Sequence, residues 1–170
     1  SKKRLVRQAL VTLPRKNGKS VLSSALALAH LCGPEAESRG QVYSAASDRD
    51  QAAIIYNEMV AFIEADAYLS ERVIIRKFKK ELEDIETGSK YKPLTADGRK
   101  AHGLNPSFVV CDELAQWKGR DLYDNLSTGS GARAEPLQVV ISTASSDPNH
   151  IMTELVNYGR KVRDGVIEDP

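Results

Sequence analysis

The sequence predicts an α/β fold in which a mainly parallel central sheet is flanked by helices and carries a small antiparallel extension at one edge. Short apolar runs that suit buried parallel strands occur at residues 8–13, 41–46, 107–111 and 137–142. Helical patterns separate these runs. Because strands that alternate with helices form parallel sheets, the order of the segments indicates the type of sheet.

Three helical patterns accompany the strands. Residues 19–32 are rich in small side chains and end before a Gly-Pro pair, which stops helices. Residues 48–65 begin at Asp48, whose side chain is suited to an N-cap, and place apolar residues at helical spacing. Residues 150–166 are amphipathic and predict a last helix that packs one face on the core.

Residues 73–95 have a different pattern, with apolar residues scattered among charges and a turn at Thr87-Gly88-Ser89. This pattern predicts two or three short antiparallel strands at a sheet edge. The basic cluster at residues 76–80 is followed at once by acidic residues, so we expect a solvated charged face there.

Composition limits the class of protein. A chain of 170 residues fits one domain, and 24 Lys and Arg against 23 Asp and Glu leave a net charge of +1, so any contact with DNA must be local. Cys32 and Cys111 lie in apolar runs and are expected to be buried thiols rather than a disulfide. No apolar stretch reaches the roughly 18 residues that cross a bilayer, so we expect an intracellular protein without a membrane partner.

The most informative segment is the loop at residues 13–20, LPRKNGKS, between the first strand and the first helix. Such a junction directs backbone N–H groups and a helix N-terminus to one point, where the phosphates of ATP or GTP bind. The loop has leucine at the first glycine position of the pattern G-x-x-x-x-G-K-S/T, followed by proline, and matches only its end. Gly18 allows close backbone approach, Lys19 neutralises phosphate oxygens, and the Ser20 hydroxyl ligates Mg²⁺. The candidate nucleotide-binding residues are Pro14, Arg15, Lys16, Asn17, Gly18, Lys19 and Ser20. A surface turn with a chance GKS match is the alternative.

A second motif is the apolar strand at residues 107–113, SFVVCDE, which ends in two carboxylates and has the Walker B pattern. Asp112 is suited to the Mg²⁺ shell, and Glu113 is suited to polarise a water for attack on the γ-phosphate. The alternative is that both residues cap the next helix, where acidic side chains are favourable.

A third motif, residues 137–144, is a strand whose polar end holds Ser142 and Thr143, hydroxyls placed to sense the γ-phosphate. Ordinary turn residues are the alternative for this motif alone. The three motifs occur in the order expected of an ATPase with a catalytic glutamate next to the Mg²⁺ aspartate. They predict a P-loop NTPase fold of the ASCE type.

These phrases resemble one family, the ATPase domain of the large terminase subunit, and most closely its HK97-type branch. PRKNGKS resembles the deviant Walker A loop of that family, and HGLNPSFVVCDELAQW resembles its Walker B block. SAASDRDQA resembles the segment after the second strand, and ISTA the coupling motif. The similarity spans about residues 11–145, and the combination is far more specific than any single motif.

The resemblance implies roles for particular residues. Lys19 and Ser20 bind nucleotide and Mg²⁺, and Asp112 is the metal-shell carboxylate. Glu113 is the catalytic base, and Arg15 contacts the γ-phosphate in cis.

Two further roles follow from the same resemblance. The coupling of hydrolysis to movement is implied for Ser142, Thr143 and Ala144. Arg99 is the candidate arginine finger that a neighbouring subunit inserts, with Lys100 second. The alternative for Arg99 is a solvated loop charge.

The resemblance also implies a biological setting. Cofactors would be ATP and Mg²⁺, and partners would be double-stranded DNA, the portal protein and the small terminase subunit, with the chain in a homo-oligomeric ring. The location would be the host cytoplasm, transiently at the procapsid portal. Because neither the usual adenine-binding segment nor an acidic nuclease centre is evident, we expect residues 1–170 to be a single ATPase domain from a longer chain.

Two other functions stay open at this point. A nucleotide-binding or assembly module without turnover is compatible with the leucine and proline that distort the loop. A helicase-like ATPase core would need a second ATPase-like domain in the same chain, and no second set of motifs is seen.

Overall fold

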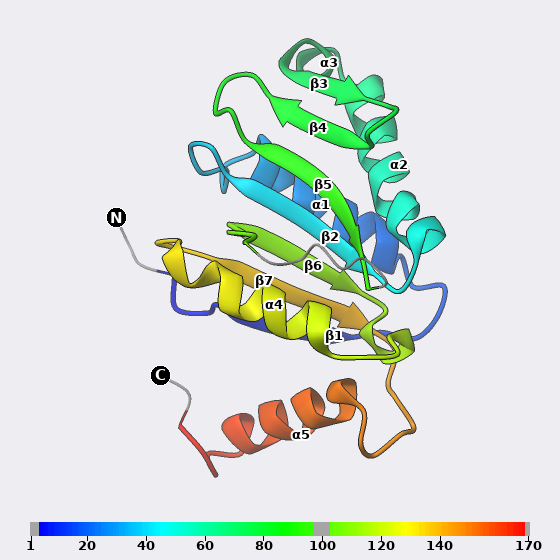
Figure 1. Ribbon diagram of the computed structural model, residues 1–170, viewed down its shortest axis with the longest axis vertical. Coiled ribbons are helices and arrows are strands. Elements are labelled where there is room, and N and C mark those ends of the chain that lie inside the picture. Colours follow the sequence, from blue (N-terminus) through cyan, green and yellow to red (C-terminus); the bar gives the residue numbers. More distant parts are fainter. Residues whose placement is uncertain (1–3, 97–102, 169–170) are drawn as a thin grey trace.

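The central sheet of the computed structural model has seven strands in the residues that it describes, 4–96 and 103–168. The strands are β1 Gln8–Thr12, β2 Gln41–Ala46, β3 Val73–Arg76, β4 Glu81–Asp84, β5 Lys90–Thr95, β6 Phe108–Asp112 and β7 Leu137–Ser142. Their order across the sheet is β1-β7-β6-β2-β5-β4-β3 (Figure 1). The pairs from β1 to β5 are parallel, whereas β4 is antiparallel to both of its neighbours. The predicted mainly parallel sheet with an antiparallel edge extension is therefore confirmed.

Each of the four apolar runs forms a strand, and residues 73–95 form the three strands at the other side of the sheet. β5 belongs to this charged segment but pairs in parallel with β2, with Tyr91 opposite Val42. Tyr91 is fully buried, and its hydroxyl shares a hydrogen bond of 2.6 Å with the hydroxyl of Ser44 on β2. These contacts place β5 within the parallel part of the sheet, so β4 and β3 alone make the antiparallel extension.

Helices cover both faces of the sheet (Figure 1). They are α1 Lys19–Leu31, α2 Arg49–Ala65, α3 Ala67–Arg72, α4 Asp121–Gly129 and α5 Ile151–Arg163, with short 3-10 helices η1 Leu114–Gln116 and η2 Ser130–Ala132. Successive residues of β6 point to opposite faces, because side chains alternate along a strand. Val110 joins the core beneath α1 and α2, and Val109 and Cys111 join the core beneath α4 and α5. The catalytic candidates lie at the end of this doubly covered strand.

The ends of two helices confirm the expected caps. The Asp48 carboxylate accepts hydrogen bonds from the backbone N–H groups of Asp50 at 3.0 Å and Gln51 at 2.9 Å, and α2 begins directly after it. At α5, Nδ1 of His150 accepts a hydrogen bond of 3.1 Å from the backbone N–H of Met152. Such side-chain caps satisfy amide groups that have no partner within the helix.

The two thiols do not form a disulfide. Cys32 and Cys111 are both free and buried, and they belong to the cores on opposite faces of the sheet. Within the described residues, the helices are too short or too polar to cross a lipid bilayer.

The charged edge around β3 and β4 is paired internally. Arg76 forms an ion pair with Glu83 on the neighbouring strand, and the Lys77 ammonium lies 3.2 Å from a carboxylate oxygen of Glu64. Lys79 and Lys80 are exposed. This arrangement matches the expected solvated charged face and gives no support for a DNA-binding patch on this edge.

Candidate nucleotide-binding site

The loop between β1 and α1 has the backbone shape that a phosphate site needs. Gly18 is the residue before α1 and has a φ of 69°, the left-handed conformation that glycine adopts without a side-chain clash. A Cβ atom at Gly18 would meet nothing within 4 Å, so the space beside this backbone is open. Lys16 also has a positive φ, 64°. The loop therefore curls around an open space at the N-terminus of α1.

Lys19 lies beneath this loop and is almost completely buried. Its Nζ donates hydrogen bonds to the carbonyl oxygens of Pro14 at 3.0 Å and Leu13 at 3.5 Å, and it lies 3.6 Å from Oε2 of Glu113. The two residues at which the loop departs from the common pattern thus supply carbonyl partners for the lysine. The loop carbonyls and the carboxylate hold the ammonium close to the place where phosphates would lie.

Asp112 ends β6, and its side chain is 4% exposed. Burial raises the pKa of Asp112 to about 6, the neighbouring Glu113 charge adds to this effect, and the Lys19 ammonium opposes it. The Asp112 carbonyl oxygen accepts a hydrogen bond of 3.0 Å from the indole N–H of Trp117, which fixes the chain after the strand. Asp112 is thus a buried carboxylate that a further positive charge would stabilise.

Glu113 occupies a left-handed backbone conformation with φ 49°, directly after β6. Its Oε1 accepts hydrogen bonds from the backbone N–H of Thr143 at 2.8 Å and from the Thr143 hydroxyl. Burial works to raise the pKa of Glu113, but these hydrogen bonds and the Lys19 charge outweigh it and hold the pKa below its usual value. Glu113 stands at the N-cap position of η1 but makes no side-chain capping bond, so the capping alternative is wrong for this residue.

The loop and the carboxylates meet in one pocket of about 310 Å³. Its lining residues are Arg15, Lys16, Asn17, Gly18, Lys19, Ser20, Val21, Gln51, Asp112, Glu113 and Gln116. Gln51 and Gln116 were given no role from the sequence. Both lie in phrases that carried the family resemblance, SAASDRDQA and DELAQW, and this was the signal that could have found them. Arg15 is exposed at the pocket, whereas Arg99 and Lys100 lie outside the described residues.

The predicted coupling residues have different positions from one another. Ser142 is fully buried, and its hydroxyl accepts a hydrogen bond from the Ala115 N–H at 3.0 Å and donates one to the Thr143 carbonyl at 2.9 Å. Thr143 contacts Glu113, and Ala144 is exposed. These contacts tie the end of β7 to the catalytic carboxylate, and the Ser142 hydroxyl is used within the fold rather than at the pocket.

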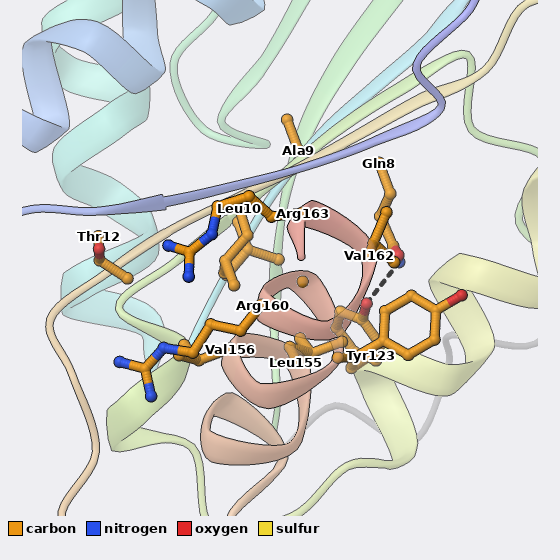
Figure 2. A pocket seen from close by; sticks show the side chains of 13 residues that line it. Gln8, Ala9, Leu10, Thr12, Tyr123, Leu155, Val156, Arg160, Val162 and Arg163 are labelled. Atoms are coloured by element: carbon orange, nitrogen blue, oxygen red, sulfur yellow. Dashed lines mark hydrogen bonds between the residues drawn. The ribbon is translucent and has the colours of Figure 1, made fainter. Parts of the chain in front are cut away.

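A second pocket, of about 540 Å³, lies between β1, β7 and α5 (Figure 2). Figure 2 shows Leu10, Leu155 and Val156 in this pocket, the arginines of α5 extending from the helix, and a hydrogen bond from Gln8 to the Tyr123 hydroxyl. None of the described residues that line it is a carboxylate, and the phosphate loop is not part of it. The smaller pocket is therefore the one that combines the chemistry of a nucleotide site.

Comparisons with known proteins agree with this site. The family model for the terminase large subunit, ATPase domain, matches residues 1–161. The large terminase subunit of Enterobacteria phage HK97 is 36% identical over 158 residues, which cover 92% of this chain and 31% of that protein. The crystal structure of the HK97 bacteriophage large terminase matches with a TM-score of 0.87 and 35% identity, over 94% of this chain and 34% of that one.

Two more distant structures share the fold. The ATPase domain of the Thermus phage P74-26 large terminase matches with a TM-score of 0.63 and 22% identity, over 82% of this chain and 60% of that one. The large terminase of another thermophilic bacteriophage, in complex with ADP, matches with a TM-score of 0.65 and 10% identity, over 92% of this chain and 38% of that one. The chain spans about a third of the length of the HK97 protein.

Proposed function

The chain belongs to the family of terminase large-subunit ATPase domains, of the HK97 type, and we propose that it hydrolyses ATP to move double-stranded viral DNA into a procapsid. The observation that carries this proposal is the meeting of the phosphate loop and two adjacent carboxylates in one pocket, with Lys19 Nζ 3.6 Å from Glu113. Family membership supplies the ATPase class. The pocket supplies residues for binding and for hydrolysis.

The donor set at this pocket fits Mg²⁺. This ion takes oxygen ligands and is usually held by one or two carboxylates together with substrate phosphates and water. Asp112 offers a buried carboxylate and Ser20 a hydroxyl, and both line the pocket. The described residues contain no group of three or more His, Cys, Asp or Glu that would form an all-protein cage, which agrees with an ion held partly by nucleotide. When bound, Mg²⁺ would neutralise charge on the phosphate oxygens.

The residues of the chain then have separate tasks. Backbone N–H groups at the start of α1 bind the phosphates, and the Lys19 ammonium moves from the Pro14 and Leu13 carbonyls to the phosphate oxygens. Glu113 orients the attacking water and accepts its proton, because its carboxylate stays ionised at neutral pH. Arg15, at the rim of the pocket, contacts the γ-phosphate in cis.

The setting in which this chemistry acts is part of the proposal. Residues 1–170 act as one ATPase domain within a homo-oligomeric ring on the portal, with the small terminase subunit as a further partner, in the host cytoplasm. A neighbouring subunit contributes a basic residue, Arg99 being the candidate. Family membership and the HK97 relatives support these statements.

The experiment is a measurement of ATP hydrolysis with and without Mg²⁺ at rising protein concentration. Glu113→Gln should keep ATP binding within about threefold and lower hydrolysis at least about 100-fold, since general-base catalysis contributes that much or more. Lys19→Ala should weaken ATP binding itself. Glu71→Gln, which changes an exposed carboxylate on α3, serves as the matched control and should change neither.

Turnover that rises faster than linearly with protein concentration would support a site completed by a neighbour. ATP binding through Lys19 without hydrolysis at any concentration would instead assign the chain to the class of nucleotide-binding modules.

A further inference from the structure

The two carboxylate oxygens of Glu113 have different surroundings. Oε1 accepts two hydrogen bonds from Thr143, one from the backbone N–H at 2.8 Å and one from the hydroxyl. Oε2 faces the Lys19 ammonium at 3.6 Å. Resting on the proposed function, we propose that Thr143 is a positioning residue that holds Oε1 so that Oε2 points into the nucleotide pocket, where it accepts a proton from the attacking water.

The asymmetry assigns the oxygens to separate tasks. An oxygen that already accepts two hydrogen bonds has little capacity left for a water, whereas Oε2 has only the ammonium nearby. Lys19 is shared with the Pro14 carbonyl at 3.0 Å, so a phosphate that takes the ammonium frees Oε2 without disturbing Oε1. Nucleotide binding would thereby expose the reactive oxygen of Glu113 at the moment when it is needed.

The position of Thr143 is itself well fixed. The preceding residue, Ser142, accepts a backbone hydrogen bond of 3.1 Å from Leu13 at the start of the phosphate loop, and its hydroxyl binds the Ala115 N–H. The backbone N–H of Glu113 donates to the Ile141 carbonyl at 2.9 Å. Threonine is β-branched, which restricts its χ1 angle and favours a single direction for the hydroxyl. The end of β7 therefore transmits its position to the carboxylate of Glu113.

A purely structural role makes a different prediction. If Thr143 only stabilised the turn after β7, its replacement would lower thermal stability and leave the turnover of the remaining folded protein unchanged. If Thr143 aims Glu113, its replacement lowers kcat and leaves nucleotide affinity unchanged, because the contact acts on the base and not on the bound phosphates.

The test compares Thr143→Val, which keeps the shape and the backbone N–H but removes the hydroxyl, with Thr143→Ser, which keeps the hydroxyl. The matched control is Thr128→Val on α4, where the hydroxyl bonds the Asp124 carbonyl at 2.9 Å away from the pocket. We expect Thr143→Val to lower kcat about tenfold with KM for ATP within about twofold, as for one lost hydrogen bond to a charged group. Thr143→Ser should keep at least about half of kcat, and the control should match the original chain.

The proposal is overturned if Thr143→Val retains the original kcat, if valine and serine reduce kcat equally, or if only KM changes. A second measurement needs neither turnover nor a substitution at Thr143. We expect the amide proton of Thr143 to keep its NMR chemical shift when the chain binds Mg²⁺ and the non-hydrolysable analogue AMP-PNP, and to change it in Glu113→Ala. A nucleotide-bound shift equal to that of Glu113→Ala would overturn the proposal.

These two measurements separate the proposals. An original chain that binds ATP but never cleaves it contradicts the proposed function, and the NMR comparison then decides alone whether Thr143 holds Glu113 in the nucleotide-bound state.

Discussion

Replacing Ser142 with alanine should destabilise the fold while leaving nucleotide binding intact. The Ser142 hydroxyl is fully buried, accepts a hydrogen bond from the Ala115 N–H at 3.0 Å and donates one to the Thr143 carbonyl at 2.9 Å. Alanine leaves both backbone groups without this partner, and an unpaired polar group costs about 1–3 kcal/mol. Taking about 2 kcal/mol, and about 2–4 °C of Tm for each kcal/mol in a domain of this size, we expect Tm to fall by about 4–8 °C.

The assay is thermal unfolding without nucleotide, together with the Kd for ATP measured well below the Tm of the variant. Ser146→Ala is the control, because Ser146 is an exposed serine in the same connection between β7 and α5. Its Tm and its Kd should both stay within error of the original chain. A roughly tenfold loss of ATP affinity in Ser142→Ala, without a change in Tm, would refute this reasoning and make Ser142 a phosphate sensor.

Two further predictions concern the core. Burial lowers the pKa of His30 from 6.5 to about 4, so its contribution to stability is fully present above about pH 6.5 and is lost as the pH falls toward 4. Urea unfolding should show His30 costing about 2 kcal/mol between pH 7 and pH 5, and an unchanged pH slope in His30→Gln would contradict this. Both thiols are buried, and burial raises the pKa of Cys111 to about 12, so a thiol reagent at pH 8 should label them only with unfolding. Rapid labelling of the folded chain would show that these thiols are accessible.

The sequence was sufficient to predict the strands and helices that carry the site. The apolar runs are long enough to need burial on both faces, and Asp48 and the glycine of the phosphate loop mark where α2 and α1 begin. Its limit appears at β5, where a charged segment pairs in parallel with β2. The side chain that makes this pairing favourable, Tyr91, gains its partner Ser44 only in the folded sheet. Periodicity along the chain contains no information on such a pair.

The candidate site divides in the same way. Lys19 and the two carboxylates were predicted because each type of side chain has a known role at the end of a strand or the start of a helix. The grip of Thr143 on Glu113 was not predicted, since the two residues are 30 positions apart and meet only because β6 and β7 are neighbours. Gln51 enters the pocket from α2 for a similar reason.

The central claim is that the phosphate loop and the two carboxylates form one nucleotide centre, and a crystal structure with Mg²⁺ and AMP-PNP tests it most directly. We predict that the triphosphate lies against the N-terminus of α1, that Lys19 Nζ leaves the Pro14 carbonyl for a phosphate oxygen, and that Oε1 of Glu113 stays on Thr143. A nucleotide bound in the pocket beside α5, or a Lys19 that remains on the loop carbonyls with nucleotide present, would contradict the account.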